Sequence, residues 1–212
     1  MSPRSAAQGG RPKPARSGRP KPAQGGRPKS ARTGRAKAAG SGHGGSHASP
    51  RVSSGCAILT VSDTRGATDD GSGDRAEALL VAAGHRVPAR RWVKDERAAI
   101  RRAALALLRR SDVDVLIVTG GTGVSPRDVT PEALEPLYAR ALAGFGERFR
   151  ARSEAQVGTA AWLSRASAGI TRGRLLVLLP GSTRAVELAL SELLLPELGH
   201  VLGLLGRTSN RE

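Results

Sequence analysis

Short apolar runs alternate with helical spacing from Gly55 onward. The apolar run 56–61 predicts a buried strand, and further strands are predicted over residues 86–93, 113–118 and 175–179. Repeats at three and four residues predict helices over about 74–84, 95–110, 131–140, 147–167 and 182–195, with a shorter helix beyond Pro196. Strands that alternate with helices favour a mostly parallel, mixed sheet covered by helices on both faces. The expected fold class is therefore a single three-layer α/β domain.

The first fifty residues follow a different pattern. Their only large apolar residue is Met1, and a basic unit recurs every eight residues, starting at Gly10, Gly18, Gly26 and Gly34. Such a segment cannot bury enough apolar surface to offset the entropy lost on ordering. We therefore expect a disordered Gly/Pro/Arg/Lys-rich tail over residues 1–54, the folded domain over 55–207, and a short C-terminal end over 208–212.

Charge is concentrated in this tail. The chain has 34 Lys and Arg against 18 Asp and Glu, a net charge of +16, and eleven of the basic residues but no acidic residue lie in 1–50. The Gly-Arg-Pro units resemble the AT-hook, in which arginines enter the narrow minor groove of A·T-rich DNA. The alternative, which we favour, is a polycation or linker without sequence preference, whose charge alone would allow non-specific contact with nucleic acid.

Composition argues against several classes of protein. Cys56 is the only cysteine and the four histidines are scattered, so a disulfide scaffold is excluded and a zinc site is disfavoured. The Leu-rich stretch 188–205 is interrupted by Glu192, Pro196 and Glu197, and no apolar signal follows the basic start. We expect a cytoplasmic protein that does not enter the membrane. An organelle transit peptide is the weaker alternative.

Three polar loops follow predicted strands, at the edge where open α/β sheets bind ligands. They are 62–74, 120–128 and 180–182. The Gly-Gly-Thr-Gly sequence of 120–123 indicates either a tight turn or a backbone that approaches an anion closely. It lacks both the Lys-Ser/Thr of a P-loop and the glycine spacing of a dinucleotide fingerprint.

Two carboxylates accompany these loops. Asp128 follows the glycine turn, and Asp95 follows the second strand, so both could offer oxygen ligands to one Mg²⁺. Each also has a structural alternative: Asp128 could stabilise its loop, and Asp95 could cap the next helix. Thr130-Pro131 is typical of a helix start, with Thr130 as the N-cap.

Taken together, these motifs resemble the MoaB/MogA family of molybdenum cofactor biosynthesis, whose members resemble molybdopterin adenylyltransferases. The resemblance covers about residues 55–207 in the family's order. It rests on Thr60-Val-Ser-Asp63, Asp70-Gly-Ser-Gly73, the fifteen residues from Thr119 to Ala133, Leu163-Ser-Arg-Ala-Ser-Ala-Gly-Ile170, and Leu179-Pro-Gly-Ser182. The fifteen-residue stretch is highly specific.

The resemblance implies an α/β domain, usually assembled as a homotrimer, that binds molybdopterin and ATP. The implied reaction transfers AMP to the terminal phosphate of molybdopterin, releases pyrophosphate, and supplies a downstream molybdopterin molybdotransferase. The family's two functional acids fall on Asp95 and Asp128, which would act catalytically and hold Mg²⁺.

The remaining site residues are assigned by chemistry. The two turns are expected to bind the nucleotide phosphates, with N–H donors from 120–123 and 181–182. The assigned residues are Gly120, Gly121, Thr122, Gly123, Pro180, Gly181 and Ser182. The pterin is expected against Ser62, Asp63, Ser72 and Gly73. Ser164 and Arg165 are expected to clamp an anion of the substrate, although Arg165 could instead be an exposed helical arginine.

Two departures favour the MoaB branch of the family. Lys94 stands where many members have proline, and Ser182-Thr183 stands where others have Asn-Pro. Two alternatives stay open. Because some MoaB-branch proteins lack the functional acids, one alternative is a non-catalytic molybdopterin carrier. The other is a nucleic-acid-binding protein whose activity lies in the tail.

Overall fold

The computed structural model describes residues 53–63 and 69–207. The predicted tail lies outside the described residues except for Ser53 and Ser54, as do the C-terminal end 208–212 and the middle of the loop after the first strand. In the described part of the chain, no helix is both long and apolar enough to cross a membrane.

One six-stranded mixed sheet forms the centre of the domain. Its strand order is β2-β1-β3-β6-β5-β4, in which β1, β2, β3 and β6 are parallel while β5 runs antiparallel to both of its neighbours. The bounds are β1 Cys56–Val61, β2 Arg90–Val93, β3 Val115–Thr119, β4 Arg140–Ala141, β5 Ser167–Thr171 and β6 Arg174–Leu179. The carboxyl ends of four strands therefore lie at one edge.

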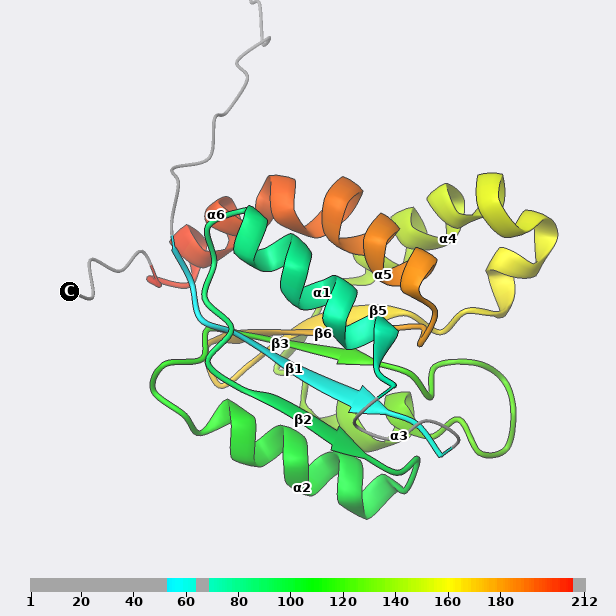
Figure 1. Cartoon of the computed structure of the whole chain (residues 1–212), viewed down its shortest axis with the longest axis horizontal. Coiled ribbons are helices and arrows are strands. Elements are labelled where there is room, and N and C mark those ends of the chain that lie inside the picture. Colours follow the sequence, from blue (N-terminus) through cyan, green and yellow to red (C-terminus); the bar gives the residue numbers. More distant parts are fainter. Residues whose placement is uncertain (1–52, 64–68, 208–212) are drawn as a thin grey trace, which may run out of the picture. The chain divides into compact units, whose positions relative to one another are not determined.

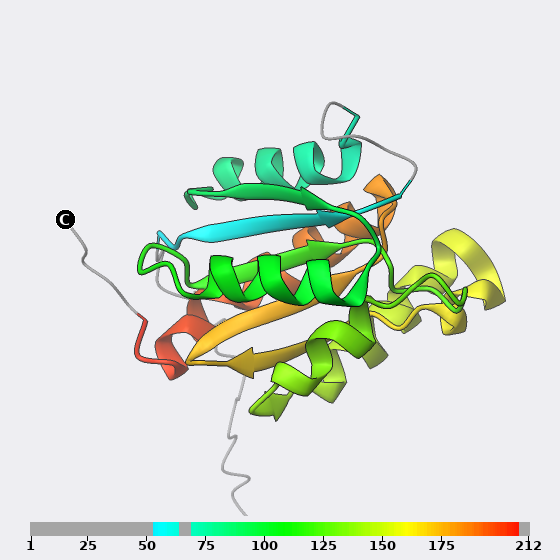
Figure 2. The ribbon, with the colours of Figure 1, turned by 90° about the horizontal axis from the view of Figure 1, so that it is seen from below.

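Helices cover both faces, which confirms the predicted three-layer α/β fold (Figures 1 and 2). The α-helices are α1 Gly71–Ala82, α2 Arg97–Leu108, α3 Thr130–Leu134, α4 Ala143–Val157, α5 Thr183–Leu188 and α6 Leu195–Leu204. Side chains alternate along each strand, so β3 sends Ile117 to a core beneath α1, α4, α5 and α6, and Leu116 to a core with α2 and α3.

The predicted helix over 147–167 is wrong at its C-terminal end. Helix α4 ends at Val157, the 3₁₀ segment η2 runs over Gly158–Leu163, and β5 begins at Ser167. Strand β5 turns into β6 through Arg172 and Gly173, whose φ angles are 50° and 69°. Positive φ at both positions is the geometry of a tight hairpin. The small residues of β5 carry little β signal, so only this pairing identifies the strand.

Other boundaries also differ from expectation. Strand β2, predicted over 86–93, begins only at Arg90. Helix α1 begins at Gly71 rather than near Asp74, because Asp70 caps it. The predicted helix over 131–140 ends at Leu134 and continues as the 3₁₀ segment η1, Glu135–Leu137, before β4. The C-terminal helix does not stop at Pro196: α5 passes through the π-helical segment η3, Ala189–Leu194, into α6. Proline has no N–H to donate, which suits this irregular junction.

Candidate functional site

The site lies where β1, β2, β3 and β6 end. The loop after β1 brings Asp63, the loop after β2 brings Asp95, and the loop after β3 brings the glycine turn and Asp128. Gly181 follows β6, and a Cβ atom on it would lie 3.3 Å from the Cα of Gly120. Segments far apart in the sequence are thus brought to the edge at which parallel sheets bind ligands.

The glycine turn needs glycine at its first two positions. Gly120 and Gly121 have φ angles of 101° and 63°. A Cβ atom on Gly120 would lie 2.0 Å from the carbonyl oxygen of Val61, at the end of β1. The close approach of the β1 and β3 ends therefore depends on the missing side chain.

Thr130 stabilises this turn with two hydrogen bonds. Its hydroxyl donates to the carbonyl oxygen of Gly120 at 2.9 Å, and its N–H donates to that of Gly121 at 3.0 Å. The expectation that Thr130 caps a helix is wrong: it is the first residue of α3, and Val129 occupies the cap position. Pro131 lies in the first turn of α3, as expected.

Several polar groups of the turn have no hydrogen-bond partner in the part of the chain that the structure describes. Within residues 53–63 and 69–207, no acceptor bonds the N–H groups of Gly121, Thr122 and Gly123. The hydroxyl of Thr122, a residue only 2 % exposed, also has no hydrogen-bond partner among the described residues. Buried polar groups are normally paired, so successive free donors here suit an anionic ligand.

The carboxylates of Asp95 and Asp128 lie against this turn. A Cβ atom on Gly121 would be 2.6 Å from Oδ2 of Asp95, and one on Gly123 would be 2.7 Å from Oδ2 of Asp128. Asp95 does not cap α2; it accepts the N–H of Val129 at 3.3 Å. Asp128 accepts the N–H of Ser125 at 2.9 Å.

These acids affect one another. Partial burial raises the pKa of Asp95, the Val129 hydrogen bond opposes the rise, and the charges of Asp128 and Asp63 add to it. Asp63 also accepts the N–H of Asp95 at 3.1 Å and forms an ion pair with Arg127. A concentration of negative charge that raises a carboxyl pKa is a site where a cation would be stabilised.

The acids fit a magnesium ion as a pair. No three His, Cys, Asp or Glu side chains gather into a metal-binding group in the described ranges. Mg²⁺ is commonly held by one or two protein carboxylates together with substrate phosphates and water. Asp95 and Asp128, which lie against Gly121 and Gly123 of the turn, offer the two carboxylates of such a donor set.

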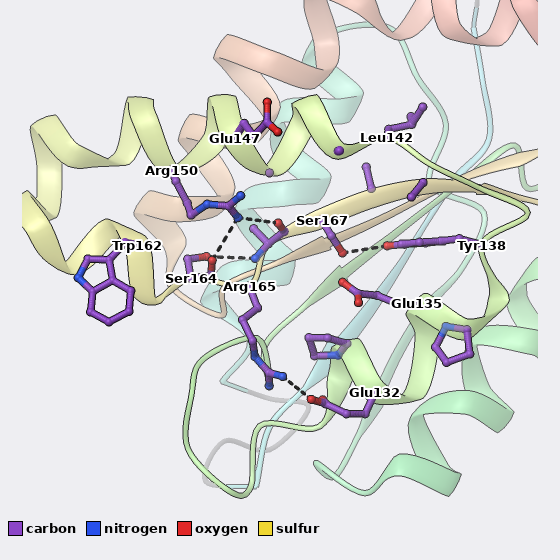
Figure 3. Close-up of a pocket in the computed structure, with 17 residues that line it drawn as sticks. Glu132, Glu135, Tyr138, Leu142, Glu147, Arg150, Trp162, Ser164, Arg165 and Ser167 are labelled. Carbon is purple, nitrogen blue, oxygen red and sulfur yellow. Dashed lines mark hydrogen bonds and ion pairs between the residues drawn. The ribbon is translucent and has the colours of Figure 1, made fainter.

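The guanidinium of Arg165 contacts the same loop, and it does so through the backbone carbonyl groups of that loop. From the segment between η2 and β5, its guanidinium donates to the carbonyl oxygens of Gly123 at 2.7 Å and Asp128 at 2.6 Å. It also forms an ion pair with Glu132 on α3 (Figure 3). Ser164, its neighbour, turns its hydroxyl to the N–H of Ala166 at 3.2 Å.

Ser72 and Gly73 lie behind the site. Both are buried at the start of α1, where the Ser72 hydroxyl donates to Asp70 at 3.1 Å and the Gly73 N–H donates to it at 2.8 Å. Ser62 is half-buried after β1 and Asp63 is exposed. Ser182 caps α5 by accepting the N–H of Ala185 at 3.2 Å, and Pro180 is half-buried beside it.

Two cavities adjoin Arg165 and Glu132. One, of about 430 Å³, is lined by residues of the loop after β3, Asp128 among them. The other, of about 840 Å³, lies between α3, α4 and the start of β5, with Arg150, Ser164 and Trp162 on its wall (Figure 3). The sequence did not point to the larger cavity, because a continuous helix was expected where η2 and β5 form its wall.

Sequence analysis also missed two ion-pair partners. Arg127 and Glu132 belong to the specific fifteen-residue stretch, but their partners Asp63 and Arg165 lie elsewhere in the chain. Only the alternation of charge within the stretch, Arg127 next to Asp128 and then Glu132, could have indicated cross-loop pairing.

Comparisons with known proteins show which family the chain resembles. Residues 57–200 match the family described as "probable molybdopterin binding domain". The chain is 45 % identical over 147 residues to the molybdenum cofactor biosynthesis protein B of Bacillus cereus, covering 69 % of this chain and 87 % of that protein.

Solved structures give the same result. A crystal structure of a molybdenum cofactor biosynthesis protein B aligns with a TM-score of 0.72 at 43 % identity, covering 74 % of this chain and 98 % of the other. The tungsten cofactor synthesizing protein MoaB from Pyrococcus furiosus aligns with a TM-score of 0.67 at 36 % identity, covering 73 % and 98 %.

Proposed function

The chain belongs to the molybdopterin-binding family of molybdenum cofactor biosynthesis proteins, and we propose that it transfers AMP from ATP to the terminal phosphate of molybdopterin, releasing pyrophosphate. One observation carries the proposal. The carboxylates of Asp95 and Asp128 lie against a turn whose N–H groups at Gly121, Thr122 and Gly123 have no acceptor among the described residues. Carboxylate ligands for a cation and N–H donors for an anion thus lie next to each other.

This arrangement suits phosphoryl chemistry. The molybdopterin phosphate must approach the α-phosphorus of ATP in line, and both groups are anionic, so catalysis consists mainly of positioning and charge neutralisation. A Mg²⁺ ion held by Asp95 and Asp128 would supply positive charge to the phosphates. The turn's N–H groups, with those of Gly181 and Ser182, are assigned to phosphate oxygens.

The pterin is assigned to the β1 side of the site. Ser62 and Asp63 would line its polar edge, and Asp63 is exposed while held by the N–H of Asp95. Ser72 and Gly73 are buried behind this wall, so their contribution would be to its shape. The hydroxyl of Thr122 is a further donor for the phosphates.

The same proposal extends to the protein's surroundings. We expect a homotrimer in the cytoplasm that passes adenylylated molybdopterin to a molybdopterin molybdotransferase. Light scattering on the purified protein tests the assembly: a mass three times that of the 22.0 kDa chain is expected, and a monomer at working concentration would contradict it.

The site assignment is tested by Asp128→Asn and Asp95→Asn. Each change removes a metal-ligand charge while keeping the size of the side chain. Turnover is expected to fall by about a hundredfold or more, while molybdopterin still binds. Asp112→Asn is the matched control, because Asp112 forms an ion pair with Arg110 before β3, at the other end of the sheet. Unchanged turnover in both site variants would refute the assignment.

A non-catalytic carrier is the competing function. It predicts that molybdopterin binds with the same affinity in the wild-type protein and in both variants, and that ATP is not consumed. The assay must include an active adenylyltransferase as a positive control, so that absent turnover is assigned to this protein and not to degraded pterin.

A further inference from the structure

We propose that Arg165 is a positioning residue that holds Asp128 in place, and that it does not itself bind the substrate's anionic groups. This inference rests on the proposed function, because it concerns the loop that carries one of the two acids. It differs from the anion-clamp role expected from the sequence, and it is argued from where each nitrogen of Arg165 donates.

The guanidinium holds the loop at both ends. Its Nε donates to the carbonyl oxygen of Gly123 at 2.7 Å, and its Nη2 donates to that of Asp128 at 2.6 Å. The backbone N–H of Arg165 adds a bond to the carbonyl oxygen of Thr122 at 2.9 Å. One residue thus fixes the start and the end of the 123–128 loop.

Outside the loop, one other side-chain anchor holds it among the described residues, the ion pair of Arg127 with Asp63 in the loop after β1. Val124 is 63 % exposed, and residues 125–127 are also exposed. The Asp128 carboxylate is oriented from within the same loop, by the Ser125 N–H and by contact with Gly123. The Arg127 side chain is 75 % exposed, so its ion pair contributes little to the order of the loop. The part-buried backbone bonds to Arg165 are therefore the anchor that determines where the carboxylate lies.

Glu132 holds the guanidinium in turn. It pairs with Nη1 of Arg165 from the first turn of α3. Burial, the largest single influence, raises the pKa of Glu132, but the bond and charge of Arg165, a backbone hydrogen bond and the charge of Arg97 together outweigh it and leave this pKa below its ordinary value. Each arm of the arginine therefore has a protein partner, and its side chain is only 34 % exposed. Three separate acceptors require the planar fork of arginine, which lysine cannot reproduce.

The main test is Arg165→Lys, which keeps the charge and removes the fork. An anion clamp would tolerate a retained cation and show mainly weaker substrate binding. A positioning residue would show kcat falling by about a hundredfold, with KM for ATP changed less than threefold. Glu132→Gln removes one arm and is expected to lower kcat by about tenfold.

The matched control is Arg174→Lys. Arg174 also donates from Nε and Nη2 to two carbonyl oxygens, those of Val113 at 2.7 Å and Arg110 at 2.8 Å, but at the opposite end of the sheet. Turnover in this variant is expected within twofold of wild type. A loss equal to that of Arg165→Lys would overturn the proposal, because turnover would then fall whenever an arginine that bonds a loop is replaced, wherever that loop lies.

A double-mutant cycle separates positioning from direct contact. If Arg165 acts through Asp128, adding Arg165→Lys to Asp128→Asn lowers turnover by less than about twofold further, because residues that act as a unit are not additive. ATP affinity in the Asp128→Asn background should likewise stay unchanged. A tenfold weaker ATP affinity in that background would assign Arg165 to the substrate and overturn the proposal.

Amide hydrogen exchange tests the inference even if no turnover is found. The Ser125 N–H, bonded to Asp128, should exchange at least tenfold faster in Arg165→Lys and at the wild-type rate in Arg174→Lys. Exchange unchanged in both variants would refute the positioning role. Wild-type protein without turnover, combined with faster Ser125 exchange in Arg165→Lys, would refute only the proposed reaction.

Discussion

At the scale of single residues, the site depends on the absence of a side chain at Gly120. Strands β1 and β3 end so close together that a side chain at this position would meet the carbonyl oxygen of Val61 at 2.0 Å. The same residue has a φ of 101°, which L-residues with a side chain rarely adopt. Sterics and backbone conformation therefore both require glycine, independently of any ligand.

We predict that Gly120→Ala lowers the free energy of unfolding by about 3 kcal/mol, measured by urea denaturation. Gly84→Ala is the control: Gly84 has a similar φ of 86°, but nothing lies within 4 Å of an added Cβ. That variant is expected to lose about 1 kcal/mol, from the backbone conformation alone. Equal losses in the two variants would show that the strand contact is unimportant.

Residue by residue, the sequence predicted the chemistry of the site better than its contacts. Asp95, Asp128 and the 120–123 turn could be placed at one edge because the carboxyl ends of parallel strands share it. The bonding of Arg165 to Gly123 and Asp128 could not be predicted, since it depends on carbonyl oxygens that every residue carries. The burial of Ser72 could not be predicted either, because the hydroxyl of Thr119, to which it is hydrogen-bonded, is distant in the sequence.

At the scale of elements, α1 is fixed by one buried acid. Asp70, 8 % exposed, caps the helix and accepts the Thr60 hydroxyl from β1 at 2.6 Å. It also pairs with Arg90 on β2 at 3.2 Å. A single carboxylate thus ties a helix to two strands of the sheet directly behind the proposed pterin wall.

We predict that Asp70→Ala destabilises the fold by roughly 3 kcal/mol, because buried donors lose their common acceptor. Asp74→Ala is the control: Asp74 pairs with the same Arg90 at 2.7 Å, but its side chain is 68 % exposed. Thermal and urea unfolding should show a loss of about 0.5 kcal/mol or less for it. A larger loss for Asp74→Ala than for Asp70→Ala would contradict this account.

Elements with strong periodicity were predicted well, and short ones were not. Buried apolar runs identified β1, β3 and β6 to within a few residues. Strands β4 and β5 were missed, because β4 has only two residues and β5 is rich in small side chains. What makes β5 a strand is its pairing with β6 through the Arg172–Gly173 turn, which is a tertiary feature.

At the scale of the whole molecule, the chain joins a family domain to a basic tail. The family match spans 57–200, and the repeats starting at Gly10, Gly18, Gly26 and Gly34 lie outside it. We expect the two parts to act separately, because the residues of the candidate site all come from the domain.

Deletion of residues 1–50 tests this separation. Removing eleven basic residues should abolish binding to duplex DNA in 50 mM salt and leave AMP transfer within twofold of the full chain. The full chain should bind A·T-rich and G·C-rich duplexes equally, with affinity that falls steeply as salt rises. Lost turnover in the truncated protein, or a preference for A·T-rich duplex that persists in 200 mM salt, would contradict the prediction.

The most direct test of the central claim is pyrophosphate release from ATP and Mg²⁺ by the purified full-length protein, with and without freshly prepared molybdopterin. We predict release only when molybdopterin is present, at one pyrophosphate per adenylylated pterin, and its loss in Asp128→Asn. Molybdopterin that binds without any release of pyrophosphate would contradict the claim and identify the protein as a carrier, leaving Asp95 and Asp128 with structural roles.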